Sequence, residues 1–227
     1  TANTETWNGT SWSEVANLSA AKYAMGGVGS NSATFAFGGT PGSGYSATTE
    51  QWSTTQPVGA WATGGDINTA RYVPGGGGSQ TAGLMFGGQP GGGTSADQTE
   101  LYNGSTWTEV ADLNTARERS ASAANSQTAA LCITGVVYPG ASLTAANESW
   151  NGTSWSEVHD VNTQRDGPFG IGTPSAALIA GGSAPPNLNV TETWNGTCWS
   201  TSPATLGQGR KDNESGGAGT STAGIIA

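Results

Sequence analysis

The residues of this chain that could bind a metal lie in three short motifs of the form Asp-x-Asn. The motifs are Asp66-Ile67-Asn68, Asp112-Leu113-Asn114 and Asp160-Val161-Asn162. Carboxylate and amide oxygens are the ligands that Ca²⁺ prefers, but a calcium site needs about six to eight of them. Asp and Asn side chains also cap their own turns, and that role accounts for the motif. We therefore expect turns here, with no metal and no other cofactor.

Residues that often act as a base or a nucleophile are scarce. The single histidine, His159, aligns with Ala16 and Ala111 elsewhere in the chain, which indicates a tolerated surface change. Cys132 lies in an apolar segment, and Cys198 aligns with serines in other copies of the same motif, so neither predicts a disulfide framework. The sequence contains no Gly-x-Ser-x-Gly turn and no histidines at metal-binding spacing. We expect a protein that is not an enzyme.

The charge of the chain argues against two classes of partner. Its formal net charge is -9 and its isoelectric point is about 4.3. Such a chain has no basic surface to neutralise phosphates, so we expect no nucleic-acid binding. No apolar run approaches the roughly 18 residues that span a bilayer, so we also expect no membrane insertion.

Tryptophan and most of the charged residues follow one internal repeat. A Glu-x-aromatic motif recurs with a spacing of 44 to 50 residues; a tryptophan follows each copy, and a basic residue follows each tryptophan. The repeated positions are Glu5, Trp7, Trp12 and Lys22; Glu50, Trp52, Trp61 and Arg71; Glu100, Tyr102, Trp107 and Arg117; Glu148, Trp150, Trp155 and Arg165; and Glu192, Trp194, Trp199 and Arg210. A supersecondary unit repeated at this length predicts a repeat architecture. We expect these residues to hold the units together, with the acidic and basic members paired in partly buried surroundings.

The unit from residue 71 to residue 112 shows how one repeat folds. Its apolar runs and turn residues predict strands at residues 72–74, 83–86, 98–102 and 106–111. The Asn103-Gly104 pair predicts a type I′ hairpin turn between the last two strands, and the same dipeptide recurs in three other units. Four antiparallel strands per unit are the pattern of a propeller blade.

We therefore predict an all-β, five-bladed β-propeller that forms a single domain over residues 1–227. The expected blades span residues 22–66, 71–112, 117–160, 165–205, and 210–227 together with 1–18. The last blade is composite, because the sequence starts on a third strand and stops after a second one. Pairing these strands would remove two exposed sheet edges and close the ring.

The repeat resembles the kelch repeat, in which a strand ends in a Gly-Gly doublet and aromatic residues follow in the next two strands. The doublets here are Gly38-Gly39, Gly87-Gly88 and Gly181-Gly182, with Thr134-Gly135 in the remaining unit. The resemblance implies that the doublet permits close backbone passage and that the aromatic residues pack between blades. Kelch propellers usually have six or seven blades, so a count of five departs from the family.

Binding is expected in the loops that do not repeat. The loops between the second and third strands cover residues 40–49, 89–98, 136–147 and 183–191, and they share one face of a propeller with the loops between blades. Their candidate ligand-binding residues are Tyr45, Asp97, Tyr138 and Asn187. The tyrosines could present amphipathic platforms to a sugar or a protein, or they could pack locally.

The style of the repeats indicates a role. The segments TETWNGTSWSEV and LNTAR resemble kelch-like repeats encoded by environmental phages in predicted structural proteins. That resemblance implies a non-catalytic structural or interaction module of a virion, such as a capsid decoration, tail or fibre component, in a virion or extracellular location. Its partners would be other virion proteins or host-surface glycans, and an oligomer or lattice is possible. The alternative is a carbohydrate-binding, lectin-like propeller.

Overall fold

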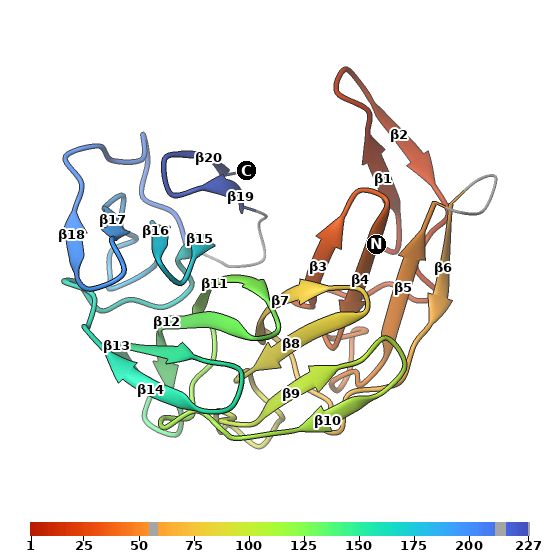
Figure 1. Cartoon of the computed structure of the whole chain (residues 1–227), viewed down its shortest axis with the longest axis horizontal. Coiled ribbons are helices and arrows are strands. Elements are labelled where there is room, and N and C mark those ends of the chain that lie inside the picture. The colour runs from red at the N-terminus through yellow and green to blue at the C-terminus, as the bar shows by residue number, and fades with distance from the viewer. Residues whose placement is uncertain (55–58, 212–216, 227) are drawn as a thin grey trace.

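The computed structural model describes residues 1–54, 59–211 and 217–226 and shows an all-β propeller. The described residues form strands, turns and loops and contain no helix. Figure 1 shows the sheets arranged around a centre, with each sheet following the previous one along the chain. The chain therefore builds the ring one repeat at a time.

Four repeats form complete blades, each a four-stranded antiparallel meander. Blade A contains β3 (Gly26–Ser30), β4 (Ala33–Phe37), β5 (Thr49–Ser53) and β6 (Ala60–Thr63). Blade B contains β7 (Gly75–Ser79), β8 (Ala82–Phe86), β9 (Thr99–Tyr102) and β10 (Trp107–Glu109). Blade C contains β11 (Ala121–Ser126), β12 (Ala129–Val137), β13 (Ser142–Trp150) and β14 (Trp155–Val158). Blade D contains β15 (Phe169–Thr173), β16 (Ala176–Ala180), β17 (Thr191–Trp194) and β18 (Trp199–Thr201).

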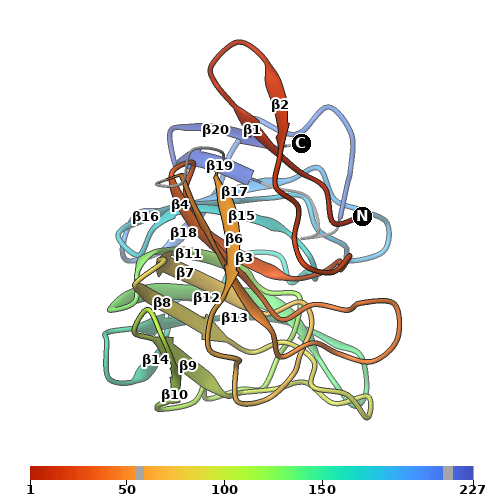
Figure 2. The same cartoon turned by 90° about the vertical axis from the view of Figure 1, so that its right-hand side faces the viewer.

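The two ends of the chain form separate two-stranded sheets. The N-terminal sheet pairs β1 (Thr4–Trp7) with β2 (Trp12–Val15), and the C-terminal sheet pairs β19 (Gly217–Thr220) with β20 (Ala223–Ile226). The structure therefore has four complete blades, and the composite fifth blade expected from the sequence is not formed. The N-terminal sheet is attached to blade A, where Trp61 Nε1 donates a hydrogen bond to Thr4 Oγ1, whereas β19 packs beside β15 of blade D, so an opening separates the two terminal sheets (Figures 1 and 2).

The Asn-Gly loops that join the last two strands of blades B, C and D differ from the expected type I′ turn, as blade B illustrates. The flanking residues Tyr102 and Trp107 pair directly, so the loop has four residues, 103–106. Within it only Gly104 has a positive φ, of 95°, while the Oδ1 atom of Asn103 accepts hydrogen bonds from the backbone of Ser105 and Thr106, both at 2.9 Å. Asn-Gly predicted the place of the turn, but the asparagine acts through its side chain.

The first strand of blade B also lies outside the predicted segment. Residues 72–74 precede it, and the strand is the glycine-rich run of β7. A Cβ atom at Gly75 would lie 2.3 Å from the Phe86 ring, and one at Gly77 would lie 2.2 Å from the Cβ of Ala124 in blade C. Side chains are excluded here because the first strands of neighbouring blades crowd together near the centre.

Aromatic residues fill the space between blades. Phe35 and Phe37 of blade A lie 6.0 Å and 5.3 Å, centroid to centroid, from Trp107 of blade B. The indole Nε1 of Trp107 donates a 3.0 Å hydrogen bond to Thr49 Oγ1 on blade A, and both residues are buried. Buried indole nitrogens require such an acceptor, so the contact fixes how one blade sits on the next.

Each complete blade also contains a buried ion pair between its repeated basic and acidic residues. In blade B, Arg71 Nη2 lies 2.9 Å from Glu100 Oε1, and both side chains are fully buried. Glu100 Oε2 accepts two further 2.8 Å hydrogen bonds, from the backbone and side-chain nitrogens of Asn68 in the loop after blade A. The asparagine of the Asp-x-Asn motif thus donates hydrogen bonds to the carboxylate of the ion pair. The other pairs are Lys22–Glu50, Arg117–Glu148 and Arg165–Glu192.

Candidate functional site

One position of the repeat, on one face of the propeller, carries side chains of different chemistry in different blades. It directly follows the buried basic residue and holds Tyr23, Tyr72, Glu118 and Asp166 in blades A to D. Each of these residues forms an isolated β-bridge to the residue that follows the glycine doublet or its Thr-Gly counterpart. The four side chains therefore start from equivalent places on one face of the propeller.

The next residue in each blade has a left-handed backbone. The φ angles are 52° at Ala24, 48° at Val73, 54° at Arg119 and 57° at Gly167. Backbone hydrogen bonds of 2.9 Å join these residues across blades, from Val73 N to Ala24 O and from Gly167 N to Arg119 O. A left-handed conformation at a β-branched residue such as Val73 costs about 1–3 kcal/mol, and such strain is concentrated at functional sites.

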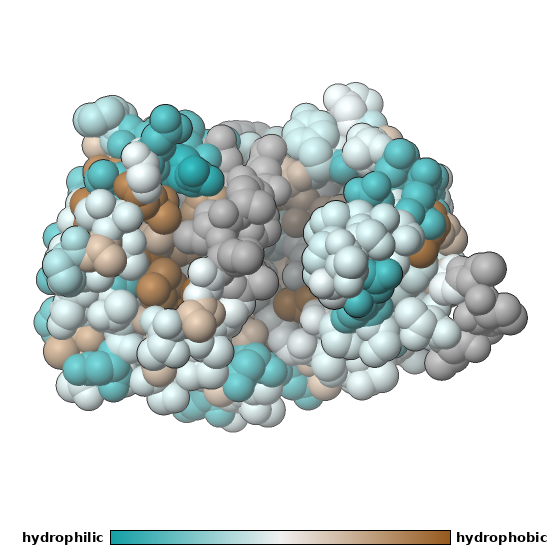
Figure 3. All heavy atoms as spheres, turned by 90° about the horizontal axis from the view of Figure 1, so that it is seen from above, coloured by the Kyte–Doolittle hydropathy of each residue, from teal (hydrophilic) through white to brown (hydrophobic). Residues whose placement is uncertain are grey.

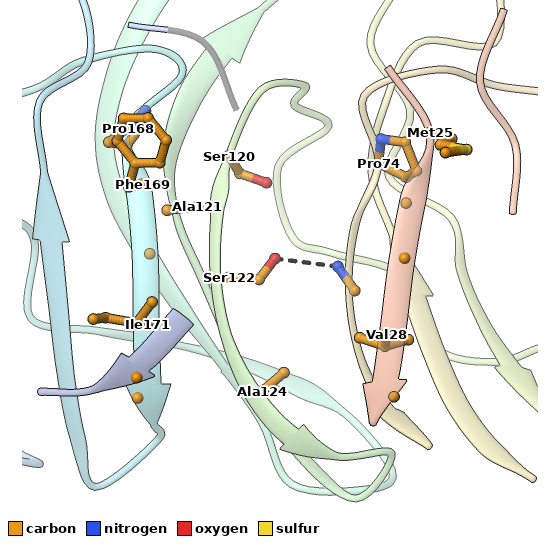
Figure 4. Close-up of a pocket in the computed structure, with 17 residues that line it drawn as sticks. Met25, Val28, Pro74, Ser120, Ala121, Ser122, Ala124, Pro168, Phe169 and Ile171 are labelled. Atoms are coloured by element: carbon orange, nitrogen blue, oxygen red, sulfur yellow. Dashed lines mark hydrogen bonds between the residues drawn. The ribbon is translucent and has the colours of Figure 1, made fainter. Parts of the chain in front are cut away.

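A cavity of about 590 Å³ lies along the centre of the ring. Figure 4 shows Met25, Pro74, Ser120 and Pro168 at one end of it, with Val28, Ala124 and Ile171 towards the other. In its wall Ser122 Oγ accepts a 3.1 Å hydrogen bond from the backbone nitrogen of Gly76. The described residues that line the cavity carry no charged side chain. The charged side chains therefore lie outside the cavity, at the end near Pro74 and Ser120.

Two stacked tyrosines stand at that end of the cavity. Tyr45, from the loop between β4 and β5, packs on Tyr72 with ring centroids 4.9 Å apart and an interplanar angle of 9°. The Tyr45 hydroxyl donates a 2.9 Å hydrogen bond to Gln89 Oε1 on blade B. Burial raises the pKa of Tyr45, with smaller contributions from Tyr72 and Glu118. Residues of two blades thus form one rigid aromatic surface.

Three charged residues, Glu118, Arg119 and Asp166, belong to the same site. Arg119 lies between two carboxylates, with its Nε 3.5 Å from Glu118 Oε1 and its Nη1 3.6 Å from Asp166 Oδ2. The Glu118 side chain is fully buried, yet no donor among the described residues meets hydrogen-bond geometry at either of its carboxylate oxygens. Burial raises the pKa of Glu118, and Arg119 and Gln89 offset that effect only in part. A buried acceptor without a donor is costly, because its lost hydration is not replaced.

We call these residues the rim cluster: Tyr45, Tyr72, Gln89, Glu118, Arg119 and Asp166. Two of its members come from second-to-third-strand loops or their ends, and four come from the segments that enter blades B, C and D. The cluster consists of two tyrosines, one amide and three charged residues, so binding there would depend on a few placed groups. Seen from above, the molecule has separate hydrophobic patches among hydrophilic residues (Figure 3).

Of the four loop residues expected to bind ligand, the structure brings only Tyr45 into the rim cluster. Tyr138 is half-buried, and its backbone nitrogen donates a 3.0 Å hydrogen bond to Ser95 Oγ. The Asp97 carbonyl accepts a 2.9 Å bond from Leu113 N, which ties its loop to the turn after blade B. Asn187 is exposed and forms a bridge to Ser183 within its own loop.

The other five members of the rim cluster were not expected from the sequence, although a signal for most of them existed. Arg119 is one of two basic residues that fall outside the repeat. Tyr72, Glu118 and Asp166 occupy the position that directly follows the repeated basic residue, and the chemistry of that position changes between units. A comparison of the units at that column would have separated variable chemistry from constant architecture.

Comparison with known proteins adds no family to this description. No family model matches the chain, and no curated protein matches it. Within residues 1–54, 59–211 and 217–226, no group of three or more His, Cys, Asp and Glu residues is placed to hold a metal ion. The same part of the chain has no helix long and apolar enough to span a membrane.

Proposed function

We propose that this protein is a non-catalytic interaction module that binds its ligand at the rim cluster. The observation that carries the proposal is the half-buried Tyr45–Tyr72 stack, which residues of two blades hold beside the half-buried charges of Arg119 and Asp166. A ligand could pack on the tyrosines and form hydrogen bonds with these charged groups. The stacked Tyr45 and Tyr72 offer apolar contact area at low entropic cost.

The chemistry of the channel supports a binding role over catalysis. The described lining residues are glycines, small or apolar residues and two serines. A general acid and base, or a nucleophile with its base, would have to lie within hydrogen-bond reach of a shared substrate. His159 is exposed on the turn after blade C, where its Nδ1 lies 2.9 Å from the Asp160 carbonyl, so its ring is engaged locally.

A carbohydrate ligand is the second candidate, and the composition of the rim cluster favours it. A flat aromatic pair, a carboxylate, an amide and a guanidinium lie within one site, and together they offer stacking, hydrogen-bond donors and acceptors. Sugar hydroxyl groups can accept hydrogen bonds from Arg119 and donate them to Asp166, and both of these side chains are half-buried. A lectin-like role would thus be one form of the same interaction module.

The resemblance of the repeats to kelch-like repeats of phage structural proteins supports a setting. We place the module on a virion or another extracellular surface, where its partners would be virion proteins or host glycans and where copies could form an oligomer or lattice. The architecture suits such a role, because a buried ion pair lies within each complete blade and aromatic contacts join blade A to blade B and blade B to blade C.

The proposal includes a ring of five blades. The four complete blades leave room for one more between blade D and blade A (Figure 1), and the two terminal sheets together have four strands. A closed ring would remove the edges of β1 and β20 from solvent, and exposed strand edges favour aggregation. A stable extracellular module needs that protection.

The rim assignment is tested by comparing variants on opposite ends of the ring. Immobilised protein is titrated with a glycan array and with whole bacterial cells, and each bound member is measured again with Arg119→Gln and Tyr45→Ala. Thr153→Ala and Thr197→Ala, in the exposed loops at the other end of the blades, are the matched controls. We expect the rim variants to weaken binding at least tenfold and the controls to leave it unchanged. The opposite pattern, or cleavage of a bound glycan detected by mass spectrometry, would contradict the proposal.

The proposed setting has its own test. Purified particles of a phage that encodes this chain are digested and analysed by mass spectrometry. We expect peptides of the chain in the particle fraction at a stoichiometric ratio to capsid protein. Their confinement to the soluble fraction of infected cells would remove the virion assignment and leave the rim assignment standing.

A further inference from the structure

An apolar groove lies between the N-terminal hairpin and blade A. It has a volume of about 340 Å³, and Trp7, Trp12, Trp52 and Trp61 are among its lining residues. Trp12 is 64% exposed and Trp7 is 42% exposed, whereas the equivalent pair in blade C, Trp155 and Trp150, is 6% and 1% exposed. Blades B, C and D bury the equivalent aromatic pair, whereas the pair of the N-terminal hairpin is left uncovered.

The two terminal hairpins have the registers of the two halves of a blade. In the N-terminal hairpin Trp7 pairs with Trp12, as Trp194 pairs with Trp199 in the outer half of blade D. In the C-terminal hairpin Gly219 pairs with Gly224, and the inner half of blade D has Gly172 paired with Ala177 at the same place. Gly219 and Gly172 also share a positive φ, of 129° and 108°. The C-terminal hairpin thus corresponds to the first two strands of a blade, and the N-terminal hairpin corresponds to the last two.

Each half already lies against the neighbour that a fifth blade would have. The first strands follow one another around the centre, β3 beside β7, β7 beside β11, β11 beside β15, and β15 beside β19. On the other side, Trp61 Nε1 donates a 3.1 Å hydrogen bond to Thr4 Oγ1, as Trp107 does to Thr49 between blades A and B. Gly219 of the C-terminal hairpin lines the central cavity together with β3 of blade A, the blade to which the N-terminal hairpin is attached.

We propose that β20 binds in this groove as the neighbour of β1, so that β19, β20, β1 and β2 form one blade within a single chain. The pairing of β16 with β17 gives the register. Because Ala177 pairs with Trp194 and Leu178 with Thr193 there, Gly224 would pair with Trp7 and Ile225 with Thr6. Residue 225 would then have the backbone position of Phe35 in blade A, where Phe35 packs on Tyr102 and Trp107 of the following blade.

Closure also assigns partners to two polar groups. Arg210 is exposed, but its carbonyl already accepts a 2.8 Å hydrogen bond from Gly182 N, the bond that Arg71 and Arg117 make in their places. Its counterpart in the repeat is Glu5, also exposed, and the two would form the fifth ion pair. Trp12 Nε1 would likewise reach Thr191 Oγ1, as Trp155 Nε1 reaches Thr99 Oγ1 at 2.8 Å.

The chain's own β20 is a better occupant than β20 of a second copy. Both halves belong to one molecule, and each is already attached to the complete blade beside it, so their association is intramolecular and has a high effective concentration. A second copy would lose translational and rotational freedom for the same contacts. The single-chain arrangement therefore prevails in dilute solution.

The test is an engineered disulfide in the full chain, in a Cys198→Ser background that leaves only the buried Cys132. Thr6→Cys is combined with Ile225→Cys, because directly paired residues have Cα atoms about 4.5–5.5 Å apart, within reach of a disulfide. Thr193→Cys with Leu178→Cys, a pair already in register in blade D, is the positive control. Ser13→Cys with Ile225→Cys is the negative control, since Ser13 lies on β2, one strand beyond Thr6.

After oxidation with diamide at micromolar concentration, we expect the 6/225 pair to form an intramolecular disulfide as completely as the 178/193 pair. The 13/225 pair should form none. A 6/225 protein that stays reduced, or that forms only disulfide-linked dimers, would overturn the proposal.

Hydrogen exchange of the unaltered chain gives a second reading that does not depend on the cysteine variants folding. We expect backbone amides of β1 to be protected to the level of β17, because strands on both sides would bond them. Exchange of alternate β1 amides within seconds, as on an open sheet edge, would also overturn the proposal.

Discussion

Trp61 Nε1 lies 3.1 Å from Thr4 Oγ1 and joins the fourth strand of blade A to the N-terminal hairpin. The same bond joins Trp107 to Thr49 and Trp155 to Thr99, at 3.0 and 2.8 Å. One tryptophan–threonine contact thus sets the position of three successive units. The N-terminal hairpin (residues 4–15) is therefore joined to blade A by the same contact that joins complete blades, although it has only two strands.

Removing one such acceptor should lower stability. Thr49→Val keeps the shape of the side chain but leaves the buried Trp107 indole without a partner, at a cost of about 1–3 kcal/mol. Urea unfolding, followed by tryptophan fluorescence, measures the change. Thr108→Val on the exposed face of the last strand of blade B is the control and should change stability by less than about 0.5 kcal/mol. Equal effects of the two variants would mean that the contact is not energetically important.

The interface between blades C and D offers the converse change. Asn147 stands where other blades have threonine, and its Oδ1 and the Trp199 Nε1 are both buried without a hydrogen-bond partner among the described residues. Asn147→Thr restores the residue that accepts this bond elsewhere, so we expect a gain of about 0.5–1.5 kcal/mol. Thermal unfolding is the measurement. A lower melting temperature would show that the weak bond from Asn147 Nδ2 to the His159 carbonyl, at 3.5 Å, matters more.

Breaking a buried ion pair on one side should be severe. Arg71 pairs with Glu100 at 2.9 Å, and burial lowers the pKa of Arg71 while Glu100 opposes that shift. Arg71→Met leaves the Glu100 carboxylate buried without its charge partner, which costs about 3–5 kcal/mol. The double variant with Glu100→Leu should recover part of that loss in the same urea assay. A double variant as unstable as the sum of the single changes would contradict this description of the pair.

The rim cluster predicts a pH-dependent effect on stability. The pKa of Glu118 is raised in the folded chain by burial, so folding favours its protonated form. Its contribution is most favourable below the unfolded pKa and is lost as the pH rises through the folded pKa. Glu118→Gln should therefore stabilise the chain at neutral pH and have little effect at about pH 4. Glu157→Gln, on an exposed strand position of blade C, should show no such trend. A benefit that grows as the pH falls would refute the assignment.

The repeat was sufficient to predict blades because one local pattern determines each of them. The spacing of glutamate, tryptophan and arginine identified units whose hydrogen bonds lie mostly within one stretch of chain. The strand in the glycine run at residues 75–79 was missed, because steric crowding by Phe86 and by Ala124 of the next blade, rather than strand propensity, determines that strand.

The rim cluster could not be predicted for a related reason. Tyr45 and Tyr72 are stacked because adjacent blades place their loops together, and no local pattern in either segment specifies that distance. The loop tyrosine was a sound candidate, since irregular loops carry function. Tyr72 and the charged members of the rim cluster lie in the segments between blades. In those segments the sequence pattern singled out only the repeated basic residues.

The double-mutant cycle between Glu5 and Arg210 tests most directly the claim that the two ends complete one blade. Glu5→Gln, Arg210→Met and the double variant are compared with the unaltered chain by urea unfolding, and the Arg71–Glu100 pair provides the reference cycle. If β20 binds in the groove, the two changes should couple by about 1–3 kcal/mol, as residues in one ion pair do. Strictly additive effects, each below about 0.5 kcal/mol as at exposed sites, would show that the ring stays open.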